Sequence, residues 1–229
     1  TAQARTPPAK TAREAEAVGV EGHRAFLSRI GLLSRLQTEL PETATPVQPR
    51  QWQAVHSITA SFGHGVATTP LQTAAAGAAL MNGGYLVQPT FLARSRAEAE
   101  AVRVPVVSGR TSDEMRYLFR LNGEQGSGKS ARVDGFDVGG KTGTAEKMID
   151  GRYRTDKRLN AYMAAFPMAS PRYVVFVMID EPQRAAGEPY ATAGWNAAPT
   201  TANIIRRAAA FLDIPPDFGT GGRQLLVSY

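Results

Sequence analysis

Three short segments in the second half of the chain constrain the fold more than any other feature. They cover residues 137–146, 159–166 and 173–180, and they are rich in the alternating, β-branched and aromatic positions that favour strands. The connections between them are short, and the last one, which contains the turn residues Ser170-Pro171, is too short for the crossover that parallel neighbours need. The sequence therefore predicts an antiparallel meander of three strands.

Helical patterns occupy other parts of the chain. Thr69 before Pro70 indicates an N-cap followed by proline at the first helical position, and Asn82 with two glycines after it ends that segment. Thr111 and Glu114 match a capping box at the start of another helix. The predicted helices cover residues 23–30, 70–81, 112–122 and 199–212. An antiparallel sheet flanked by helices is an α+β fold.

Proline and glycine suggest one main unit with two looser ends. Residues 1–16 are rich in Ala, Thr, Arg and Pro, and Pro7-Pro8 disfavours regular structure, so we expect a divergent or disordered lead-in there. Residues 17–212 are expected to form the folded part, and residues 213–229 a C-terminal tail that begins near Pro215-Pro216. The last helix is expected to carry one apolar stripe of residues: Ile204, Ile205, Ala208, Phe211 and Leu212.

Composition excludes several classes of site. The chain has no cysteine, and its three histidines, His23, His56 and His64, lack the spacing of metal ligands, so we predict neither a metal nor another cofactor. The net charge is +6, but basic residues are dispersed among acidic ones, so a nucleic-acid partner is not expected. A basic surface is compatible with an anionic polymer such as cell-wall murein.

The chain also lacks the patterns of membrane insertion and export. Its longest strongly apolar run, residues 173–179, is far shorter than the roughly 20 residues that span a bilayer. No basic-then-apolar signal segment opens the chain. We therefore expect no transmembrane segment within these residues, which does not by itself assign a cellular location.

One glycine-rich segment matches a nucleotide-binding pattern. Residues 123–130, GEQGSGKS, satisfy the P-loop consensus, in which Lys129 would bind phosphate. A P-loop leaves a buried strand and enters a helix, whereas here a predicted helix comes before the glycines and a strand after them. A flexible surface loop is the favoured interpretation, with a P-loop nucleotide site as the alternative.

A second motif lies on the first predicted strand. It consists of Lys141, Thr142, Gly143 and Thr144, and Lys-Thr-Gly is an element of serine acyltransferases that bind penicillin. On an edge strand the Lys141 ammonium and the Thr142 hydroxyl can hold a carboxylate, while Gly143 leaves room for a substrate backbone. The peptide groups of Thr144 can pair with an extended substrate or donate to an oxyanion. The alternative is a solvated lysine at a strand edge.

Six ordered segments extend this pattern across the chain: residues 17–23 (AVGVEGH), 61–72 (SFGHG and TPLQ), 82–85 (NGGY), 115–118 (MRYL), 138–147 (VGGKTGTAEK) and 190–199 (YATAGWNAAP). From about residue 17 to residue 216 the chain resembles class B penicillin-binding proteins, most closely division-specific peptidoglycan D,D-transpeptidases of alphaproteobacterial type. The resemblance implies the C-terminal portion of a transpeptidase domain, with a partial β-lactamase-like fold.

The resemblance also implies an activity. In the family a serine attacks the D-Ala-D-Ala bond of a stem peptide and passes the acyl group to the amine of another stem, and β-lactams acylate the same serine. Lys141 and Thr142 would hold the terminal carboxylate, and the Thr144 amide would be one of two oxyanion donors. The implied location is the periplasmic side of the bacterial inner membrane, at the septum, with peptidoglycan stem peptides, β-lactams and possible divisome proteins as partners.

Two family motifs are absent from these residues. No serine has lysine three positions later, and no Ser-x-Asn triplet occurs. Because the nucleophile belongs to Ser-x-x-Lys, we expect this polypeptide alone to form no acyl-enzyme. Two interpretations remain open: the substrate-binding portion of a transpeptidase, and a non-catalytic protein that binds murein peptides or division partners.

Other polar and aromatic residues have alternative roles. His64 is expected to pack a loop rather than act as an acid or base, because no orienting partner is identifiable in the sequence, and His23 is expected to be structural. Asp180 and Glu181 are adjacent on a strand and would point to opposite faces, which disfavours joint catalysis. Trp195 is expected to pack in the core.

The two charged residues that follow the strand motif have two alternative roles. Glu146 and Lys147 come directly after the Lys-Thr-Gly-Thr segment. Either side chain could touch a substrate or face solvent.

Overall fold

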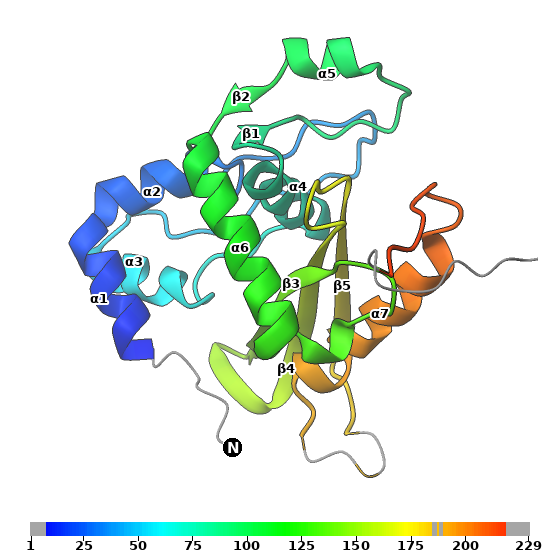
Figure 1. The fold of residues 1–229 in the computed structure, drawn as a ribbon. Coiled ribbons are helices and arrows are strands. Elements are labelled where there is room, and N and C mark those ends of the chain that lie inside the picture. The colour runs from blue at the N-terminus through cyan, green and yellow to red at the C-terminus, as the bar shows by residue number, and fades with distance from the viewer. Residues whose placement is uncertain (1–7, 185–186, 188–189, 219–229) are drawn as a thin grey trace, which may run out of the picture.

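A three-stranded antiparallel sheet forms the centre of the protein (Figure 1). The computed structural model describes residues 8–184, 187 and 190–218. Its sheet has the order β3-β4-β5, built from β3 (Gly139–Ile149), β4 (Arg152–Phe166) and β5 (Tyr173–Asp180). The predicted meander is confirmed, since each of the three predicted segments overlaps one of these strands.

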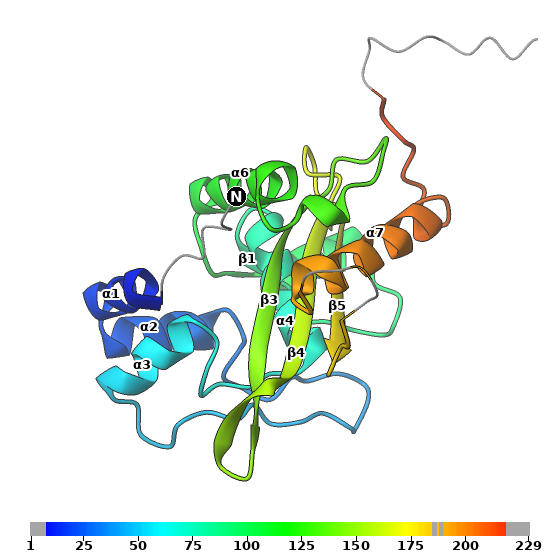
Figure 2. The same ribbon diagram turned by 90° about the horizontal axis from the view of Figure 1, so that it is seen from below.

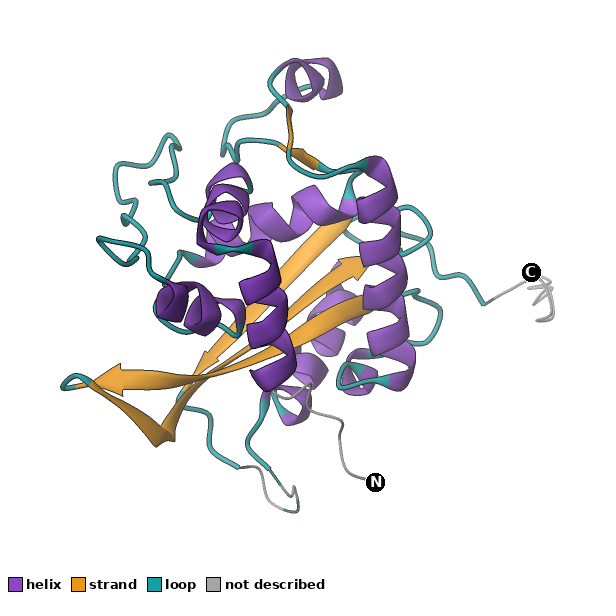
Figure 3. Cartoon of the chain, turned by 90° about the vertical axis from the view of Figure 1, so that its left-hand side faces the viewer, coloured by secondary structure: helices purple, strands orange, loops and turns teal. Residues whose placement is uncertain are grey.

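The first two strands continue as a hairpin beyond the predicted segments. The register of β3 and β4 shifts between Glu146 and Lys147, and the strands then pair on to Ile149 and Arg152. Asp150 and Gly151 close the hairpin, both with positive φ. The outer part of the hairpin projects beyond the helices that flank the sheet (Figure 3).

Helices cover both faces of the sheet. The α-helices are α1 (Pro8–Val18), α2 (Val20–Arg29), α3 (Ala54–Ser61), α4 (Pro70–Met81), α5 (Arg96–Ala101), α6 (Gly109–Gln125) and α7 (Ala197–Ala208). Ile205 of α7 packs with Tyr162 and Phe166 in one buried cluster, whereas Met81 of α4 and Phe119 of α6 pack with Ala165 in another. In Figure 2, α7 lies on one side of the sheet and the cluster of α1, α2 and α3 lies away from it. The predicted α+β class is confirmed.

Helix α4 has the predicted bounds, and its caps explain why. Thr69 Oγ1 accepts a hydrogen bond from the backbone N–H of Gln72, and the Gln72 side chain accepts one from the N–H of Thr69. These reciprocal bonds satisfy N–H groups that the start of a helix leaves without partners. Helix α2 contains most of the predicted segment 23–30.

Helix α6 begins earlier than its predicted start at residue 112. Ser108 is its N-cap, and the Ser108 hydroxyl accepts from the N–H of Thr111. The capping box expected at Thr111 and Glu114 is therefore wrong, because both residues lie within the first turns of the helix. The buried hydroxyl of Ser112 instead donates to the carbonyl oxygen of Leu80 at the end of α4.

The predicted disordered lead-in is wrong for residues 8–16. Helix α1 begins at Pro8, where the missing N–H of proline removes no helical hydrogen bond. Ala15 of this helix is buried, and α1 packs against α3, a helix that the sequence patterns did not predict. Residues 1–7 of the predicted lead-in lie outside the described part of the chain.

The C-terminal part also differs from expectation. Helix α7 ends at Ala208, so the helical spacing stops before Phe211, which is 91% exposed rather than buried. Ile214 joins the core with 4% exposure, and the backbone N–H of Asp217 donates to Gly135 O, so packing continues past residue 212. Residues 219–229 of the predicted tail lie outside the described part.

A smaller unit lies at the edge of the molecule, at the top of Figure 1. It consists of the two-stranded sheet of β1 (Tyr85–Leu86) and β2 (Val104–Pro105) with α5, and none of these elements was predicted. No helix among the described residues is both long and apolar enough to cross a membrane.

Candidate functional site

The motif Lys141, Thr142, Gly143 and Thr144 lies on β3, at one edge of the sheet. β3 pairs with β4 alone in the described part of the chain, so its second edge has no partner strand. The residues at positions 141, 143 and 144 are exposed. The strand edge can therefore accept an extended chain by adding it to the sheet.

Two buried glycines before the motif seat β3 in the protein. A β-carbon on Gly140 would lie 2.5 Å from the Tyr162 ring of β4. A β-carbon on Gly139 would lie 2.8 Å from the backbone carbonyl carbon of Phe119 in α6. These glycines let the strand approach its neighbours closely, which explains the pair of glycines that precedes Lys141.

Lys141 and Thr142 lie on opposite faces of β3 because successive side chains of a strand alternate. The Lys141 ammonium nonetheless turns back to donate to the carbonyl oxygen of Thr142, at 2.7 Å. Although Lys141 as a whole residue is exposed, protein around its ammonium group removes water from it, and this burial lowers the pKa of Lys141. The Lys141 ammonium thus lies beside the peptide unit of Thr142.

Two further polar residues belong to the site, and sequence reasoning missed them. Ser127 Oγ lies 2.7 Å from Thr142 Oγ1, and the Ser127 backbone N–H donates to Asn122 Oδ1 at 3.2 Å. Asn122 Nδ2 donates in turn to Gly140 O at 2.7 Å. Both residues come from α6 and the turn after it, inside or next to the segment that resembles a P-loop.

The P-loop interpretation of residues 123–130 is wrong in its geometry. Gly123 lies inside α6, and Lys129 begins the short 3-10 helix η1 (Lys129–Ala131). No strand leads into the segment, and no α-helix leaves it to present amides to a phosphate. The expected flexible loop is also wrong at Ser127 and Gly128, because Gly128 is buried and Ser127 is tied to Asn122.

The segment before α7 packs onto the Thr142 and Thr144 face of β3. Thr144 Oγ1 accepts a hydrogen bond from the backbone N–H of Ala193, at 3.3 Å, in the short 3-10 helix η2 (Ala193–Trp195). Asn160, which pairs with Thr144 across the sheet, donates to Ala191 O at 2.7 Å. Trp195 is 38% exposed, so the expectation that it packs in the core is wrong.

Acidic residues at the end of β5 form ion pairs with lysines of the hairpin. Lys147 Nζ lies 2.9 Å from Asp180 and 3.0 Å from Glu181, and these hydrogen bonds raise the pKa of Lys147. Glu181 also pairs with Lys157, and this contact and the one to Lys147 lower the pKa of Glu181. Lys147 therefore ties the hairpin to β5. No group of three or more His, Asp or Glu residues in the described ranges could hold a metal ion.

Both histidines discussed from the sequence make packing contacts. The His64 ring stacks on Tyr153 of the hairpin, with ring centroids 4.5 Å apart and planes 18° apart. His23 Nδ1 lies 2.7 Å from Ser57 Oγ, which connects α2 to α3. These contacts favour structural roles for both residues.

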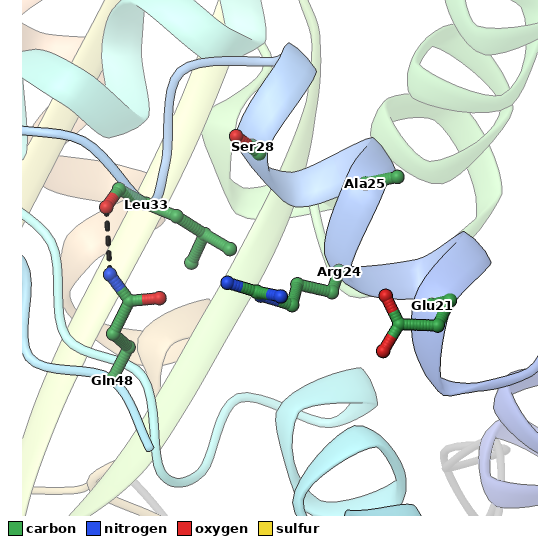
Figure 4. Close-up of a pocket in the computed structure, with 6 residues that line it drawn as sticks. All are labelled: Glu21, Arg24, Ala25, Ser28, Leu33 and Gln48. Carbon is green, nitrogen blue, oxygen red and sulfur yellow. Dashed lines mark hydrogen bonds between the residues drawn. The ribbon is translucent and has the colours of Figure 1, made fainter. Parts of the chain in front are cut away.

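A cavity of about 330 Å³ lies elsewhere, beside α2 (Figure 4). Its lining residues are Glu21, Arg24, Ala25, Ser28, Leu33 and Gln48. Two of the lining residues are bonded to each other, since the Gln48 amide donates to Leu33 O at 2.8 Å. None of these residues lies on β3, so the cavity is separate from the strand motif, and the chemistry of that motif rather than the cavity identifies the candidate site.

Comparison with known proteins gives a consistent match. The family model described as the penicillin binding protein transpeptidase domain matches residues 10–206. The chain is 37% identical over 214 residues to the probable peptidoglycan D,D-transpeptidase FtsI of Caulobacter vibrioides, which covers 89% of this chain and 36% of that protein. The chain thus spans about a third of the length of this relative.

Solved structures agree with the sequence match. The transpeptidase domain of penicillin-binding protein 3 from Burkholderia pseudomallei superposes with a TM-score of 0.79 and 26% identity, covering 91% of this chain and 62% of that one. Penicillin-binding protein 3 from Mycobacterium tuberculosis, solved in complex with ampicillin, gives a TM-score of 0.75 and 26% identity, covering 95% and 52%.

Proposed function

Because this chain belongs to the penicillin-binding protein transpeptidase family, we propose that it forms the carboxylate-binding side of a serine-type peptidoglycan D,D-transpeptidase. The observation that carries the proposal is the position of Lys141, Thr142, Gly143 and Thr144 on the edge strand β3. The ligands that follow from the family are peptidoglycan stem peptides ending in D-Ala-D-Ala and β-lactams.

In this proposal Lys141 and Thr142 hold the terminal carboxylate of the ligand. The Lys141 ammonium lies 2.7 Å from the carbonyl oxygen of Thr142, and in the proposal a carboxylate at this strand edge bonds both the ammonium and the Thr142 hydroxyl. Hydrogen bonds between ionised partners are roughly twice as strong as neutral ones. A bound carboxylate also offsets the loss of water that lowers the pKa of Lys141.

Gly143 and Thr144 bind the peptide part of the ligand. Gly143 has no side chain to block the approach of a substrate backbone, and an edge strand can pair with an extended peptide. The backbone N–H of Thr144 donates to the oxygen that becomes negative when the D-Ala carbonyl is attacked. The Thr144 hydroxyl is already engaged, because it accepts from Ala193 N.

The chemical step needs a nucleophile and a group that takes its proton. In the family the serine of Ser-x-x-Lys attacks the D-Ala carbonyl, the terminal D-Ala leaves as a free amine, and the amine of a second stem peptide then takes the acyl group. These 229 residues contain neither Ser-x-x-Lys nor Ser-x-Asn. The polypeptide alone therefore binds the ligand without forming an acyl-enzyme.

The cellular role follows from the same family. The proposal assigns the protein to septal cell-wall cross-linking on the periplasmic side of the inner membrane, with contacts to other division proteins. A second candidate is a non-catalytic protein that binds murein peptides. An upstream coding sequence that carries both missing motifs in frame would support the transpeptidase, and an upstream sequence without them would support the binding protein.

Two measurements test the proposal. The first is a titration with acetyl-D-Ala-D-Ala, followed by the amide chemical shifts of Lys141 to Thr144, against the same dipeptide with its terminal carboxylate converted to an amide. The acid should shift these signals and bind more tightly than the amide. Equal binding of the two ligands, or shifts confined to other parts of the chain, would refute the carboxylate site.

The second measurement is incubation with a fluorescent penicillin, with a complete class B penicillin-binding protein as the positive control. The expected result is no stoichiometric covalent adduct. A one-to-one adduct would overturn the statement that the chain alone is not acylated, and mapping the adduct would identify the nucleophile.

A further inference from the structure

We propose that Ser127 is a positioning residue that orients the Thr142 hydroxyl and so strengthens the hold of β3 on a ligand carboxylate. This inference rests on the proposed function and adds a residue to its site. The two hydroxyl oxygens lie 2.7 Å apart, although Ser127 belongs to the turn between α6 and η1 rather than to β3.

The side-chain amide of Asn122 holds this turn against the strand. Asn122 Nδ2 donates to Gly140 O at 2.7 Å, and Asn122 Oδ1 accepts from the backbone N–H of Ser127 at 3.2 Å. The first contact requires a donor and the second an acceptor, so the two partners together fix which way the amide points. Ser127 is thereby tied to the strand two residues before Thr142.

Close packing leaves the turn little freedom to move. A β-carbon on Gly128 would lie 2.6 Å from the Tyr162 hydroxyl oxygen, so the turn is seated directly on β4. On another side, a β-carbon on Gly194 would lie 3.1 Å from Ser127 O. The position of the Ser127 hydroxyl is therefore set by two neighbouring segments as well as by Asn122.

The distances indicate where the Ser127 proton goes. Ser127 has one hydroxyl proton and two acceptors within reach, Thr142 Oγ1 at 2.7 Å and Asn122 Oδ1 at 3.3 Å. Hydrogen bonds between hydroxyl groups are most common near 2.7–2.8 Å, and Asn122 Oδ1 already accepts from a backbone N–H. Ser127 accordingly donates to Thr142.

A Thr142 hydroxyl that accepts from Ser127 keeps its own proton for another acceptor. A carboxylate at the edge of β3 is such an acceptor, and Lys141 supplies the compensating charge beside it. Without the Ser127 hydroxyl, Thr142 loses the bond that directs its proton outward. The carboxylate then meets a hydroxyl that must first be oriented, which weakens binding.

The test compares the affinities of the acid and amide forms of acetyl-D-Ala-D-Ala for the whole chain, followed by amide chemical shifts. Ser127→Ala should bind the acid about three- to tenfold more weakly, the effect of one oriented hydrogen bond, and should shrink the difference between acid and amide. Ser127→Thr keeps the hydroxyl and should restore that difference. Ser130→Ala removes an exposed hydroxyl in the following residues and should change nothing.

Each outcome has a separate meaning. A wild-type chain that does not distinguish acid from amide refutes the carboxylate site, and the inference with it. A wild-type chain that distinguishes them, with Ser127→Ala equally able to do so, refutes the role of Ser127 alone. If Ser127→Ala loses its dispersed amide spectrum, Ser127→Cys is the replacement, because cysteine fills a similar space but is only a weak donor. This variant should also show a smaller difference in affinity between the acid and the amide. A difference equal to that of wild type would refute the role of Ser127.

Discussion

Gly123 of α6 lies directly against Gly139 of β3. A β-carbon on Gly123 would stand 3.4 Å from Gly139 Cα and only 2.7 Å from the carbonyl oxygen of Val138. Contacts under 3.0 Å between a β-carbon and backbone do not persist in folded proteins, so this glycine sets how closely α6 approaches the candidate substrate strand. The glycine that begins the P-loop pattern is thus a packing residue.

Alanine at either glycine should push α6 and β3 apart. We expect Gly123→Ala and Gly139→Ala each to lower the free energy of unfolding by about 1–3 kcal/mol through overpacking. Urea unfolding followed by circular dichroism measures this. Gly109, at the start of α6, has open space where its β-carbon would be, so Gly109→Ala should be neutral or stabilising by up to about 1 kcal/mol. A Gly123→Ala protein as stable as Gly109→Ala would contradict the packing role.

Gln72 connects α4 to the loop after α2. Its side chain is 2% exposed, and Nε2 donates to Gly31 O at 3.1 Å and to Ser34 O at 2.7 Å. Gln72→Ala should cost about 2–4 kcal/mol of unfolding free energy, because it leaves two carbonyl groups without their donor and opens a cavity.

Two further variants separate the contribution of the Gln72 hydrogen bonds to stability from the contribution of its side-chain volume. Gln72→Glu preserves the size but turns a carboxylate oxygen toward the two carbonyl oxygens, so it should also destabilise. Gln51→Ala changes an exposed glutamine and should stay within about 0.5 kcal/mol of wild type. Equal stability of Gln72→Glu and wild type would show that the hydrogen bonds contribute little.

The charged Lys141 side chain is expected to lower the free energy of unfolding. Burial lowers the pKa of its ammonium group below the ordinary 10.5, so the native state holds the charge less favourably than the unfolded chain does. This cost is fully present below the folded pKa and disappears as the pH rises through it toward 10.5. Lys141→Met should therefore keep or raise the free energy of unfolding at pH 7, with a smaller gain in alkaline solution.

The same Lys141→Met variant should bind acetyl-D-Ala-D-Ala about ten- to a hundredfold more weakly, as expected for a lost charge-assisted hydrogen bond. Lys129→Met, at an exposed lysine, is the control and should alter neither property. A clear loss of stability at pH 7 in Lys141→Met would contradict the prediction that the Lys141 charge destabilises the fold. Unchanged binding would contradict the prediction that this charge holds the ligand carboxylate.

His23 should make the fold sensitive to mild acid. Burial lowers the pKa of His23 below its ordinary 6.5, and the contact with Ser57 partly opposes that effect. The unfolded chain then takes up a proton at a higher pH than the folded chain. The contribution of His23 to stability is present above pH 6.5 and is lost as the pH falls from there through the folded pKa.

A His23→Gln variant isolates this contribution. Its unfolding free energy should fall less steeply than that of wild type over the interval just below pH 6.5, as measured by urea unfolding at a series of pH values. Parallel curves for the two proteins would exclude His23 as the cause.

Helices and strands with strong local sequence patterns could be predicted. Their exact boundaries could be predicted only where a single set of capping residues was available. The bounds of α4 follow from Thr69, Pro70 and the glycines that end the helix, because capping and backbone freedom act within a few residues. The start of α6 cannot be predicted in the same way, because Ser108 and Thr111 are both acceptable N-caps. In the structure Ser108 is the cap, and Ser112 lies inside the helix and donates to Leu80 O.

Burial was the least predictable property. Phe211 and Trp195 are large apolar residues, which usually favours the interior, yet both are partly or largely exposed. Phe211 lies beyond the end of α7, where the helical spacing no longer applies. Whether a residue is buried depends on which other segments of the chain pack against it. A periodic pattern within one segment contains no information about that packing.

The amino-acid sequence alone determined the family, the meander and the place of Lys141 to Thr144 on its first strand, because these follow from motifs and spacing along one stretch of chain. Only the tertiary structure decided that Ser127 meets Thr142. This contact depends on the return of the turn after α6 to the strand, where Gly123 and Gly139 approach each other closely. Contacts between separate segments are set by packing, which the local chemistry of either segment does not specify.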